Sequence, residues 1–268
     1  MWWTAAGVGL TVGETPVNRF AAPSTEPDPP RSAAPPSDSV ARPAAALSPA
    51  RVAQAQPLLA GAPAHGAAIE LAEAARDLPS LRAALENFDG CALKKTATQL
   101  VFSDGAPGSR VMFVGEGPGG DEDRIGRPFV GRAGQLLDRM LKAIGLDRTR
   151  VYIANVVPWR PPGNRTPTPE ETQACLPFIR RQIALASPEI LVCLGAHSAQ
   201  TLLGVKSITR ARGAWTRYEL RDGRTIPAIA MFHPAYLLRT PSQKRAAWAD
   251  MRALADALVR SPLPSGEE

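Results

Sequence analysis

Side chains that could do chemistry follow three short apolar runs of this sequence. Glu116, Glu122 and Asp123 lie in a loop directly after the run VMFVG. Asn155 ends the run VYIAN, and His233 follows the run IPAIAMF. A carboxylate can position water, a carboxamide offers a donor and an acceptor together, and a neutral imidazole can donate to a developing anion. These residue types indicate a ligand site that is assembled from separate segments.

The loop after VMFVG is too long and too rich in glycine to serve only as a connection to the next element. Its glycines let the backbone approach a ligand closely, and GEGPGG at 115–120 could form a phosphate-binding turn. However, the loop lacks the Lys-Ser/Thr of a P-loop, and its four acids would repel phosphate. Phe129 stands in the same loop, either as core filler or as part of the site.

The elements that must position these residues alternate between strand and helix patterns. Strands are predicted at 110–115, 151–156, 190–195 and 226–231, and helices at 132–145, 169–186, 196–203 and 242–258. This alternation predicts an α/β fold with a parallel sheet that is covered on both faces. Ligands of such sheets bind at the carboxyl ends of the strands. The loop after residue 115, Asn155 and His233 would therefore face one crevice.

Composition divides the chain of 268 residues into two parts. Residues 1–79 are rich in Ala and Pro and carry a net charge of −2, and we expect a disordered extension there. Residues 80–262 are expected to form the folded catalytic domain, and the chain from residue 80 onward carries +8. A basic domain suits a polyanionic partner, although mild basicity alone hardly favours nucleic acid.

Cysteine usage and hydropathy bear on the compartment. Three cysteines give no even disulfide framework, which favours a reducing compartment. No run is long enough for a transmembrane helix, so we expect no membrane association and a cytoplasmic protein. The opening MWWTAAGVGLTVG leaves two interpretations open, a cryptic targeting segment or a miscalled start codon.

Six segments in colinear order resemble the family 4 uracil-DNA glycosylases. They are GEGPGGDED at 115–123, GRPFVGRAGQLLDRML at 126–141, VYIANVV at 151–157, RPPGNRTP at 160–167, ACLPFI at 174–179 and HPAYLLR at 233–239. The resemblance implies a three-layer α/β/α sandwich around a small parallel sheet. It also implies hydrolysis of the N-glycosidic bond of uracil in DNA, which is the first step of base-excision repair.

The resemblance also implies roles for individual residues. Those expected to contact a flipped uracil are Gly115, Gly117, Gly119, Phe129 and Asn155. Those expected to contact DNA are Arg165, Leu237, Leu238, Arg239 and Lys244, with the two leucines as part of a wedge in the vacated base stack. The candidates for catalysis are Glu116, Glu122, Asp123 and His233. No step requires a metal ion.

One departure from other glycosylase families concerns the carboxylate. Gly117 occupies the position where many of those families carry a water-activating Asp. The carboxylate must then come from Glu116, Glu122 or Asp123, and the sequence does not decide among them. We favour Glu116 because it adjoins the glycines that would face the substrate. An alternative role for Glu116, holding the loop through its backbone N–H groups, stays open.

A second departure concerns iron. The family 4 resemblance implies a [4Fe–4S] cluster on four cysteines, but the corresponding positions read Phe88, Cys91, Trp159 and Cys175. Cys193 lies inside the apolar run ILVCLG, where a buried structural thiol is expected. Two thiolates do not hold a cubane. We therefore expect that the cofactor is absent and that Phe88 and Trp159 pack hydrophobically in its place.

Three alternatives come from other classes of function. One is a catalytically weak protein that binds uracil or damaged bases, and another is a relative that captures the abasic sugar covalently. The third, a nucleotide-dependent α/β enzyme, is disfavoured by the missing phosphate signature. We expect a nucleoid-associated monomer without an obligate protein partner. The range of bases excised and the preference for single- or double-stranded DNA stay open.

Overall fold

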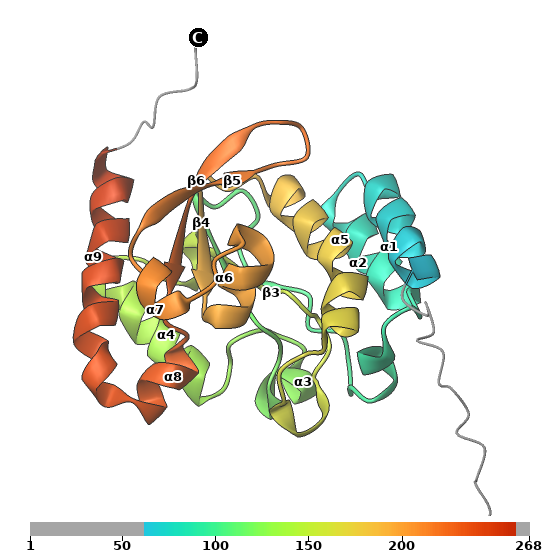
Figure 1. Cartoon of the computed structure of the whole chain (residues 1–268), viewed down its shortest axis with the longest axis horizontal. Helices are drawn as coiled ribbons and strands as arrows, with labels where there is room; N and C mark the ends of the chain where they lie inside the picture. The colour runs from blue at the N-terminus through green and yellow to red at the C-terminus, as the bar shows by residue number, and fades with distance from the viewer. Residues whose placement is uncertain (1–61, 261–268) are drawn as a thin grey trace, which may run out of the picture. The chain divides into compact units, whose positions relative to one another are not determined.

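The computed structural model describes residues 62–260, which form a six-stranded sheet with helices on both faces (Figure 1). The strands are β1 (Asp104–Gly105), β2 (Val111–Gly115), β3 (Tyr152–Asn155), β4 (Ile190–Leu194), β5 (Trp215–Glu219) and β6 (Thr225–Met231). They lie in the order β1-β3-β2-β4-β6-β5. The four central strands are parallel, and β1 and β5 pair antiparallel to them at the edges.

Helices lie between the four parallel strands in the order of the chain. The α-helices are α1 (Ala62–Ala74), α2 (Leu78–Asn87), α3 (Gly120–Ile125), α4 (Arg132–Ala143), α5 (Pro169–Ala186), α6 (Ala196–Leu203), α7 (Ile208–Ala211), α8 (Pro234–Arg239) and α9 (Lys244–Arg260). Short 3₁₀ turns are η1 (Ala92–Lys95), η2 (Arg148–Arg150), η3 (Pro162–Asn164) and η4 (Pro241–Gln243). No helix within residues 62–260 is long and apolar enough to cross a membrane.

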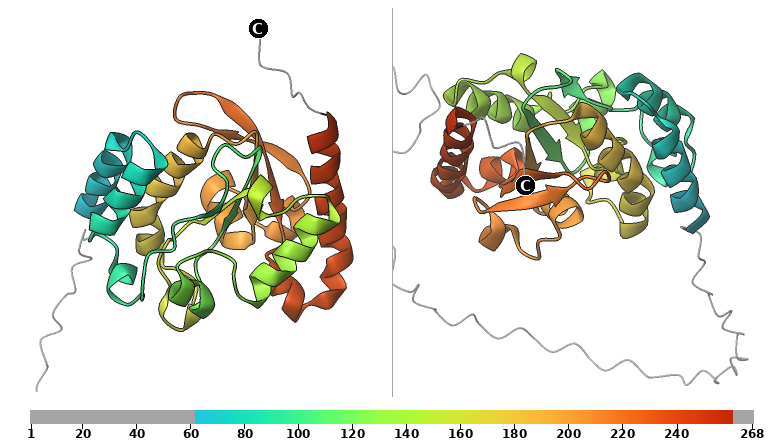
Figure 2. Two further views of the ribbon diagram at one scale, coloured as in Figure 1. Left: turned by 180° about the vertical axis from the view of Figure 1, so that it is seen from behind. Right: turned by 90° about the horizontal axis from the view of Figure 1, so that it is seen from above.

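The alternation of side chains along the strands builds the three layers, which Figure 2 shows from above. Met112 and Val114 of β2 join the core under α5 and α6. Val111 and Phe113 face the other way, into the core under α4 and α9. Successive side chains of a strand point to opposite faces, so a strand that is apolar throughout serves both cores. The predicted α/β/α sandwich is confirmed.

The parallel register brings the carboxyl ends of the central strands together. Gly115 at the end of β2 pairs with Asn155 at the end of β3. Beyond β4, the N–H of Gly195 donates to the carbonyl of Met231 at 2.8 Å, and His233 follows two residues later. The segments that were predicted to share one crevice therefore meet at the carboxyl ends of the central strands.

Residues 62–79 correct the predicted domain boundary. Helix α1 packs along α5, and Ala68 and Ala72 of α1 are fully buried in the main core. Their spacing of four residues places them on one helix face, but alanine-rich sequence resembles the preceding low-complexity stretch. The expectation of disorder is thus wrong for residues 62–79, and residues 1–61 lie outside the described part of the chain.

Candidate active site

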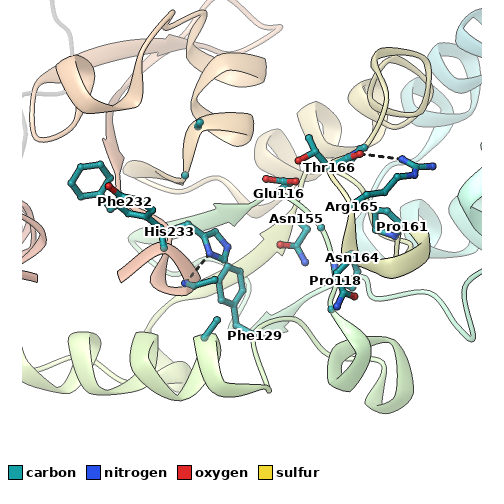
Figure 3. Close-up of a pocket in the computed structure, with 18 of the residues that line it drawn as sticks. Glu116, Pro118, Phe129, Asn155, Pro161, Asn164, Arg165, Thr166, Phe232 and His233 are labelled. Carbon is teal, nitrogen blue, oxygen red and sulfur yellow. Dashed lines mark hydrogen bonds between the residues drawn. The ribbon is translucent and has the colours of Figure 1, made fainter. Parts of the chain in front are cut away.

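A cavity of about 620 Å³ opens at the carboxyl ends of the parallel strands (Figure 3). It is lined by the loop after β2, the end of β3, the segment around η3, the start of α6, and the segment that joins β6 to α8. The lining includes Glu116, Gly117, Gly119, Glu122, Phe129, Asn155, Arg165, His233 and Arg239. Gly115 lies directly beneath, against two of these side chains. Most of the predicted site residues thus meet in one cavity.

Asn155 presents an unused acceptor to this cavity. Its side chain is 4% exposed, and its Oδ1 has no hydrogen-bond partner among residues 62–260. An acceptor left without a partner in a buried place costs about 1–3 kcal/mol. Native proteins usually satisfy such atoms. The orphaned Oδ1 therefore marks the place where a ligand donor would bind.

Gly115 allows Asn155 and Phe129 to approach each other. A Cβ atom on Gly115 would lie 2.5 Å from Asn155 Oδ1 and 2.6 Å from Phe129 Cζ. Both distances are shorter than any real Cβ contact, so a larger residue would displace the amide, the ring or both. Gly115 therefore makes room for these two side chains, and its predicted contact with the ligand stays a prediction.

Phe129 forms one wall of the cavity. Its φ of +55° lies in the left-handed region, which is uncommon for a residue with a side chain. The ring is 5% exposed and stacks on His233, with 5.4 Å between ring centroids and 29° between planes. A flat apolar face held in this way suits a planar, unsaturated ligand.

His233 is held as a neutral donor. As the N-cap of α8, its Nδ1 accepts the N–H of Ala235 at 3.1 Å. Since Nδ1 is an acceptor, the proton of the neutral ring lies on Nε2. Burial, with a smaller contribution from the positive charge of Arg239, lowers the pKa of His233 from 6.5 to about 4. At neutral pH this ring can donate a hydrogen bond without carrying a charge.

The three candidate carboxylates have different surroundings. Glu122 accepts the N–H groups of Gly119 at 3.1 Å, Val130 at 2.9 Å and Gly131 at 2.8 Å. The carboxylate of Glu116 lines the cavity and accepts no hydrogen bond from residues 62–260. Glu122 is therefore occupied by the backbone, whereas Glu116 is available to water or a ligand.

Asp123 lies outside the cavity lining. Its carboxylate accepts the backbone N–H and the hydroxyl of Thr98, each at 2.8 Å, and a longer contact from the N–H of Gln99. These bonds tie α3 to the segment that precedes β1. Asp123 therefore stabilises the fold and does not face the cavity.

His197 is a neighbour of the site that sequence reasoning missed. Burial lowers the pKa of His197, while the charge of Glu116 acts in the opposite direction. Thr172 donates its hydroxyl proton to the carbonyl of Thr168 at 2.9 Å and contacts His197 Nε2 at 3.2 Å. Thr172 must then accept from Nε2–H, because its single proton is already used. The position of His197 just after β4, at a strand's carboxyl end, is the signal that could have found it.

The predicted DNA contacts divide by exposure. Arg239 and Lys244 are exposed, and Arg239 also lines the cavity. Leu238 is half-buried beside them. Arg165 lines the cavity and makes two hydrogen bonds to the carboxylate of Glu171, at 2.7 and 2.8 Å.

Leu237 corrects the predicted wedge. Its side chain is 1% exposed and packs in a small core with Leu136, Phe232 and Ala247. A side chain that is enclosed in this way cannot enter a base stack without unfolding the start of α8. In the structure Leu237 therefore belongs to the core, and the half-buried Leu238 is the better placed of the two leucines to act as the wedge.

A family model of the uracil DNA glycosylase superfamily matches residues 102–252, and the chain belongs to this superfamily. Within the superfamily it is similar to type-4 uracil-DNA glycosylases. The enzyme of Thermotoga maritima is 46% identical over 156 residues, which are 58% of this chain and 79% of the relative. That of Archaeoglobus fulgidus is 41% identical over 171 residues, 62% of this chain and 85% of the relative. The predicted resemblance to family 4 is confirmed.

A more distant relative is the type-5 uracil-DNA glycosylase of Pyrobaculum aerophilum. It is 29% identical over 175 residues, which are 59% of this chain and 73% of the relative. The part of this chain that the family model matches includes the carboxyl ends of the four parallel strands, where the cavity lies.

The comparisons contradict the expectation that the protein has no cofactor. The chain is 39–46% identical to type-4 enzymes, a family of iron–sulfur proteins, so the absence of a cluster does not follow from the cysteine count. In the structure, the sulfur atoms of Cys91 and Cys175 lie 3.7 Å apart in the core. Phe88 and Trp159 are buried in that same core. Cys193 is a third free cysteine of the same core.

Proposed function

We propose that this uracil-DNA glycosylase reads a flipped uracil through Asn155 and cleaves its N-glycosidic bond with Glu116 and His233. Family membership and the type-4 relatives make the chain a hydrolase of N-glycosyl bonds in DNA. The observation that carries the assignment of residues is the buried Oδ1 of Asn155, which has no partner among residues 62–260.

Asn155 discriminates uracil from cytosine by the direction of its hydrogen bonds. Its Oδ1 accepts the N3–H of uracil, and its amide N–H donates to O4. Cytosine offers an unprotonated N3 and an amino group at these positions, so both contacts would become repulsive. A site built to hydrogen-bond one pattern rejects the other strongly, because its buried polar groups are left unpaired.

Phe129 and His233 act on the base. Unstacking a nucleotide costs a few kcal/mol, and the ring of Phe129 offsets part of that by stacking on uracil. When the C1′–N1 bond breaks, its electron pair leaves with uracil and negative charge develops on O2. The Nε2–H of neutral His233 donates to that oxygen, together with the backbone N–H of Gly117.

Glu116 acts on the sugar and on water. Its carboxylate stabilises the positive charge that develops at C1′ and orients a water molecule whose oxygen bonds to C1′. The proton released by that water passes to Glu116 or to solvent, and uracil leaves as the anion before it is protonated. The available carboxylate of Glu116 supports this role, whereas Glu122 and Asp123 are hydrogen-bonded to the backbone.

The DNA strand lies over the rim of the cavity in this proposal. Arg239 and Lys244 hold phosphates, Leu238 enters the vacated stack, and Arg165 approaches the strand from the opposite side. We also propose that the catalytic domain begins by residue 62 rather than 80. The protein acts as a monomer in the cytoplasm, in association with the nucleoid.

An oligonucleotide with a single uracil tests these roles. After incubation and alkali, the wild-type protein is expected to cleave the strand at that position. Asn155→Ala and His233→Ala should each lower single-turnover excision about 100- to 1,000-fold, as loss of one donor does in other enzymes. DNA binding through the basic rim should persist in both.

The same experiment separates the alternative functions. A wild-type protein that shifts the oligonucleotide without cleavage would be a binder, and an SDS-stable complex would indicate covalent capture. Full activity of both variants would overturn the assignment of Asn155 and His233. Lys142→Ala, an exposed change on α4 outside the cavity lining, serves as the control and should keep wild-type excision.

A further inference from the structure

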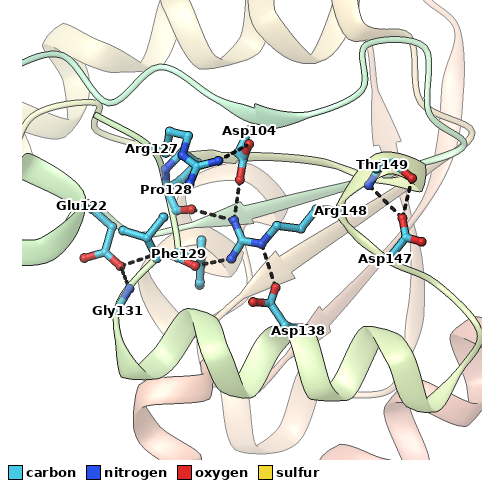
Figure 4. Close-up of polar contacts among 11 residues, drawn as sticks. Asp104, Glu122, Arg127, Pro128, Phe129, Gly131, Asp138, Asp147, Arg148 and Thr149 are labelled. Atoms are coloured by element: carbon cyan, nitrogen blue, oxygen red, sulfur yellow. Dashed lines mark hydrogen bonds and ion pairs between the residues drawn. The ribbon is translucent and has the colours of Figure 1, made fainter. Parts of the chain in front are cut away.

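Phe129 occupies a backbone conformation that it would not adopt unaided. Its φ of +55° falls in a sparsely populated region for residues with a Cβ atom, and such a conformation costs of the order of 1–3 kcal/mol. It persists only where the surroundings impose it. Figure 4 shows charged side chains of opposite sign on the two sides of this segment.

On the carbonyl side, the segment is held by Arg148 of η2. The guanidinium donates to the carbonyl of Pro128 at 3.2 Å and to the carbonyl of Phe129. These two carbonyls flank the Cα of Phe129, so one planar group constrains both of its backbone angles. Arginine suits this task because its donors are arranged in a rigid fork.

Two carboxylates fix the orientation of that guanidinium. Asp104 of β1 accepts from Nη1 of Arg148 at 2.5 Å, and Asp138 of α4 accepts from Nε at 2.7 Å. The arginine side chain is 24% exposed and that of Asp104 is 15% exposed. Partly desolvated, charge-assisted bonds of this kind are stronger than those between neutral groups. The contacts of Arg148 with β1 and α4 are therefore independent of its contacts with the carbonyls of Pro128 and Phe129.

On the amide side, the segment is held by Glu122. One oxygen of its carboxylate accepts the N–H of Val130 at 2.9 Å and of Gly131 at 2.8 Å. The peptide group between Phe129 and Val130 is thus bound at both ends, its carbonyl by a cation and its N–H by an anion. The other oxygen accepts the N–H of Gly119 at 3.1 Å, which connects the glycine loop to the same carboxylate.

We propose that Arg148 and Glu122 are positioning residues that hold Phe129 as a preformed stacking surface for the base. This inference rests on the proposed function, in which Phe129 stacks on uracil. The two residues touch neither base nor sugar in this scheme and act through the Phe129 backbone. Without them the segment relaxes to negative φ, and the ring leaves its place against His233.

A double-mutant cycle with Phe129→Ala tests the inference, because it separates positioning from general stability. Arg148→Met alone should lower kcat/KM for uracil excision about 10- to 100-fold, since small misplacements in an active site have effects of this size. In the Phe129→Ala background the same change should lower kcat/KM less than threefold. Melting temperatures should fall by similar amounts in both backgrounds, because the ion pairs are lost in both.

Arg148→Lys and Glu122→Gln keep the inference testable if Arg148→Met does not fold. Lysine retains the charge but not the fork, so Arg148→Lys should recover only part of the activity. Glutamine turns an N–H donor toward the N–H of Gly119 or of Val130, so Glu122→Gln should lower kcat/KM. In the Phe129→Ala background the same substitution should have little further effect on kcat/KM. Arg150→Met, which removes an exposed arginine of the same turn, is the control and should keep wild-type activity.

The outcomes are distinct. If the losses from Arg148→Met and Phe129→Ala multiply in the double variant, Arg148 does not act through Phe129 and the inference fails. Wild-type kcat/KM in both Arg148→Met and Glu122→Gln would also overturn it. Full activity of Phe129→Ala alone would instead refute the stacking role in the proposed function, and the inference would fall with it.

Discussion

The two walls of the cavity are built on opposite principles. On the wall formed by Phe129, charged side chains bind the backbone on both sides, although the conformation they hold is strained. On the wall formed by Asn155, the backbone is an ordinary strand end, and the cost lies in a buried side-chain oxygen without a partner in the described chain. The strain at Phe129 is offset by hydrogen bonds within the protein. The desolvation cost at Asn155 is offset only when a ligand donates to its Oδ1.

This contrast predicts that substitutions at the two walls differ in their effects on stability and on excision activity. Changes at the Phe129 wall disturb bonds that the folded protein makes with itself, so they should affect both properties. Changes at Asn155 remove an atom that the folded protein leaves unsatisfied, so activity should fall with little effect on stability. Variants of the two walls and of their supports can therefore distinguish the two properties.

The largest effect is expected from Gly115→Ala, which acts on both walls together. The new methyl group would lie 2.5 Å from Asn155 Oδ1 and 2.6 Å from the Phe129 ring. We expect a loss of excision greater than about 100-fold, as displacement of reacting groups by about 1 Å can cause. Single-turnover kinetics on a uracil oligonucleotide measure it.

Gly66→Ala is the matched control for this glycine change. Gly66 lies in α1, and a Cβ atom there would meet nothing within 4 Å. Activity should be unchanged, and the helix should gain roughly 0.5–1 kcal/mol of stability. Near-normal excision by Gly115→Ala would show that Asn155 and Phe129 can move away from the new methyl group without loss of function.

The next effect concerns the support behind His233. Leu237→Ala should lower the free energy of unfolding by about 2–5 kcal/mol, the usual cost for an enclosed leucine. Leu238→Ala should cost less than about 1 kcal/mol, because that side chain is half-buried. Denaturant titration of both variants measures the difference, and equal losses would contradict the division between core and rim.

The lowered pKa of His233 should make the free energy of unfolding depend on pH. Its pKa is about 4 in the folded protein against 6.5 for the ordinary group. Between these values the unfolded chain binds a proton that the folded chain does not, so stability falls as pH drops from 6.5 to 4. Stability from this source is fully present above pH 6.5.

Denaturant titrations of wild type and His233→Gln at several pH values measure this slope. The variant should show a shallower decrease between pH 6.5 and 4. Burial also lowers the pKa of His197, so part of the decrease should remain in His233→Gln. Identical slopes for the two proteins would mean that His233 is protonated as readily as an exposed histidine.

The smallest effect is expected for the stability of Asn155→Ala. Removing the orphaned Oδ1 relieves a desolvation cost, which offsets the loss of the packing that this side chain provides. The free energy of unfolding should therefore change by less than about 1 kcal/mol, although excision is lost. A large destabilisation by thermal and denaturant unfolding would show that the amide holds the fold as well as the ligand.

Much of the central architecture could be predicted from periodicity. The strand at 111–115 is apolar throughout because both of its faces are covered, and such runs mark parallel strands. The edge strand β5 was missed, because in WTRYE only Tyr218 is buried and the apolar pattern is weak. Helix α1 was missed because its contact with α5 uses alanines, which carry little hydrophobic signal.

The site was predictable only in part. Asn155 and His233 stand at the ends of strands, where topology brings them together. The surroundings of the three carboxylates were not predictable, because they depend on distant partners such as Thr98, which lies 25 residues before Asp123. Leu237 and Leu238 are adjacent in sequence and chemically identical, so only tertiary packing tells the buried one from the other.

The packing of α1 against α5 bears on how the protein can be shortened. The contact is reinforced where His65 Nδ1 meets the carbonyl of Gln173 at 2.8 Å, near the end of α5 that bears Glu171. Glu171 in turn holds Arg165 at the cavity. A truncation at residue 80 would therefore uncover an apolar flank of α5 and loosen the anchoring of an active-site arginine, so an active fragment should retain the chain from residue 62.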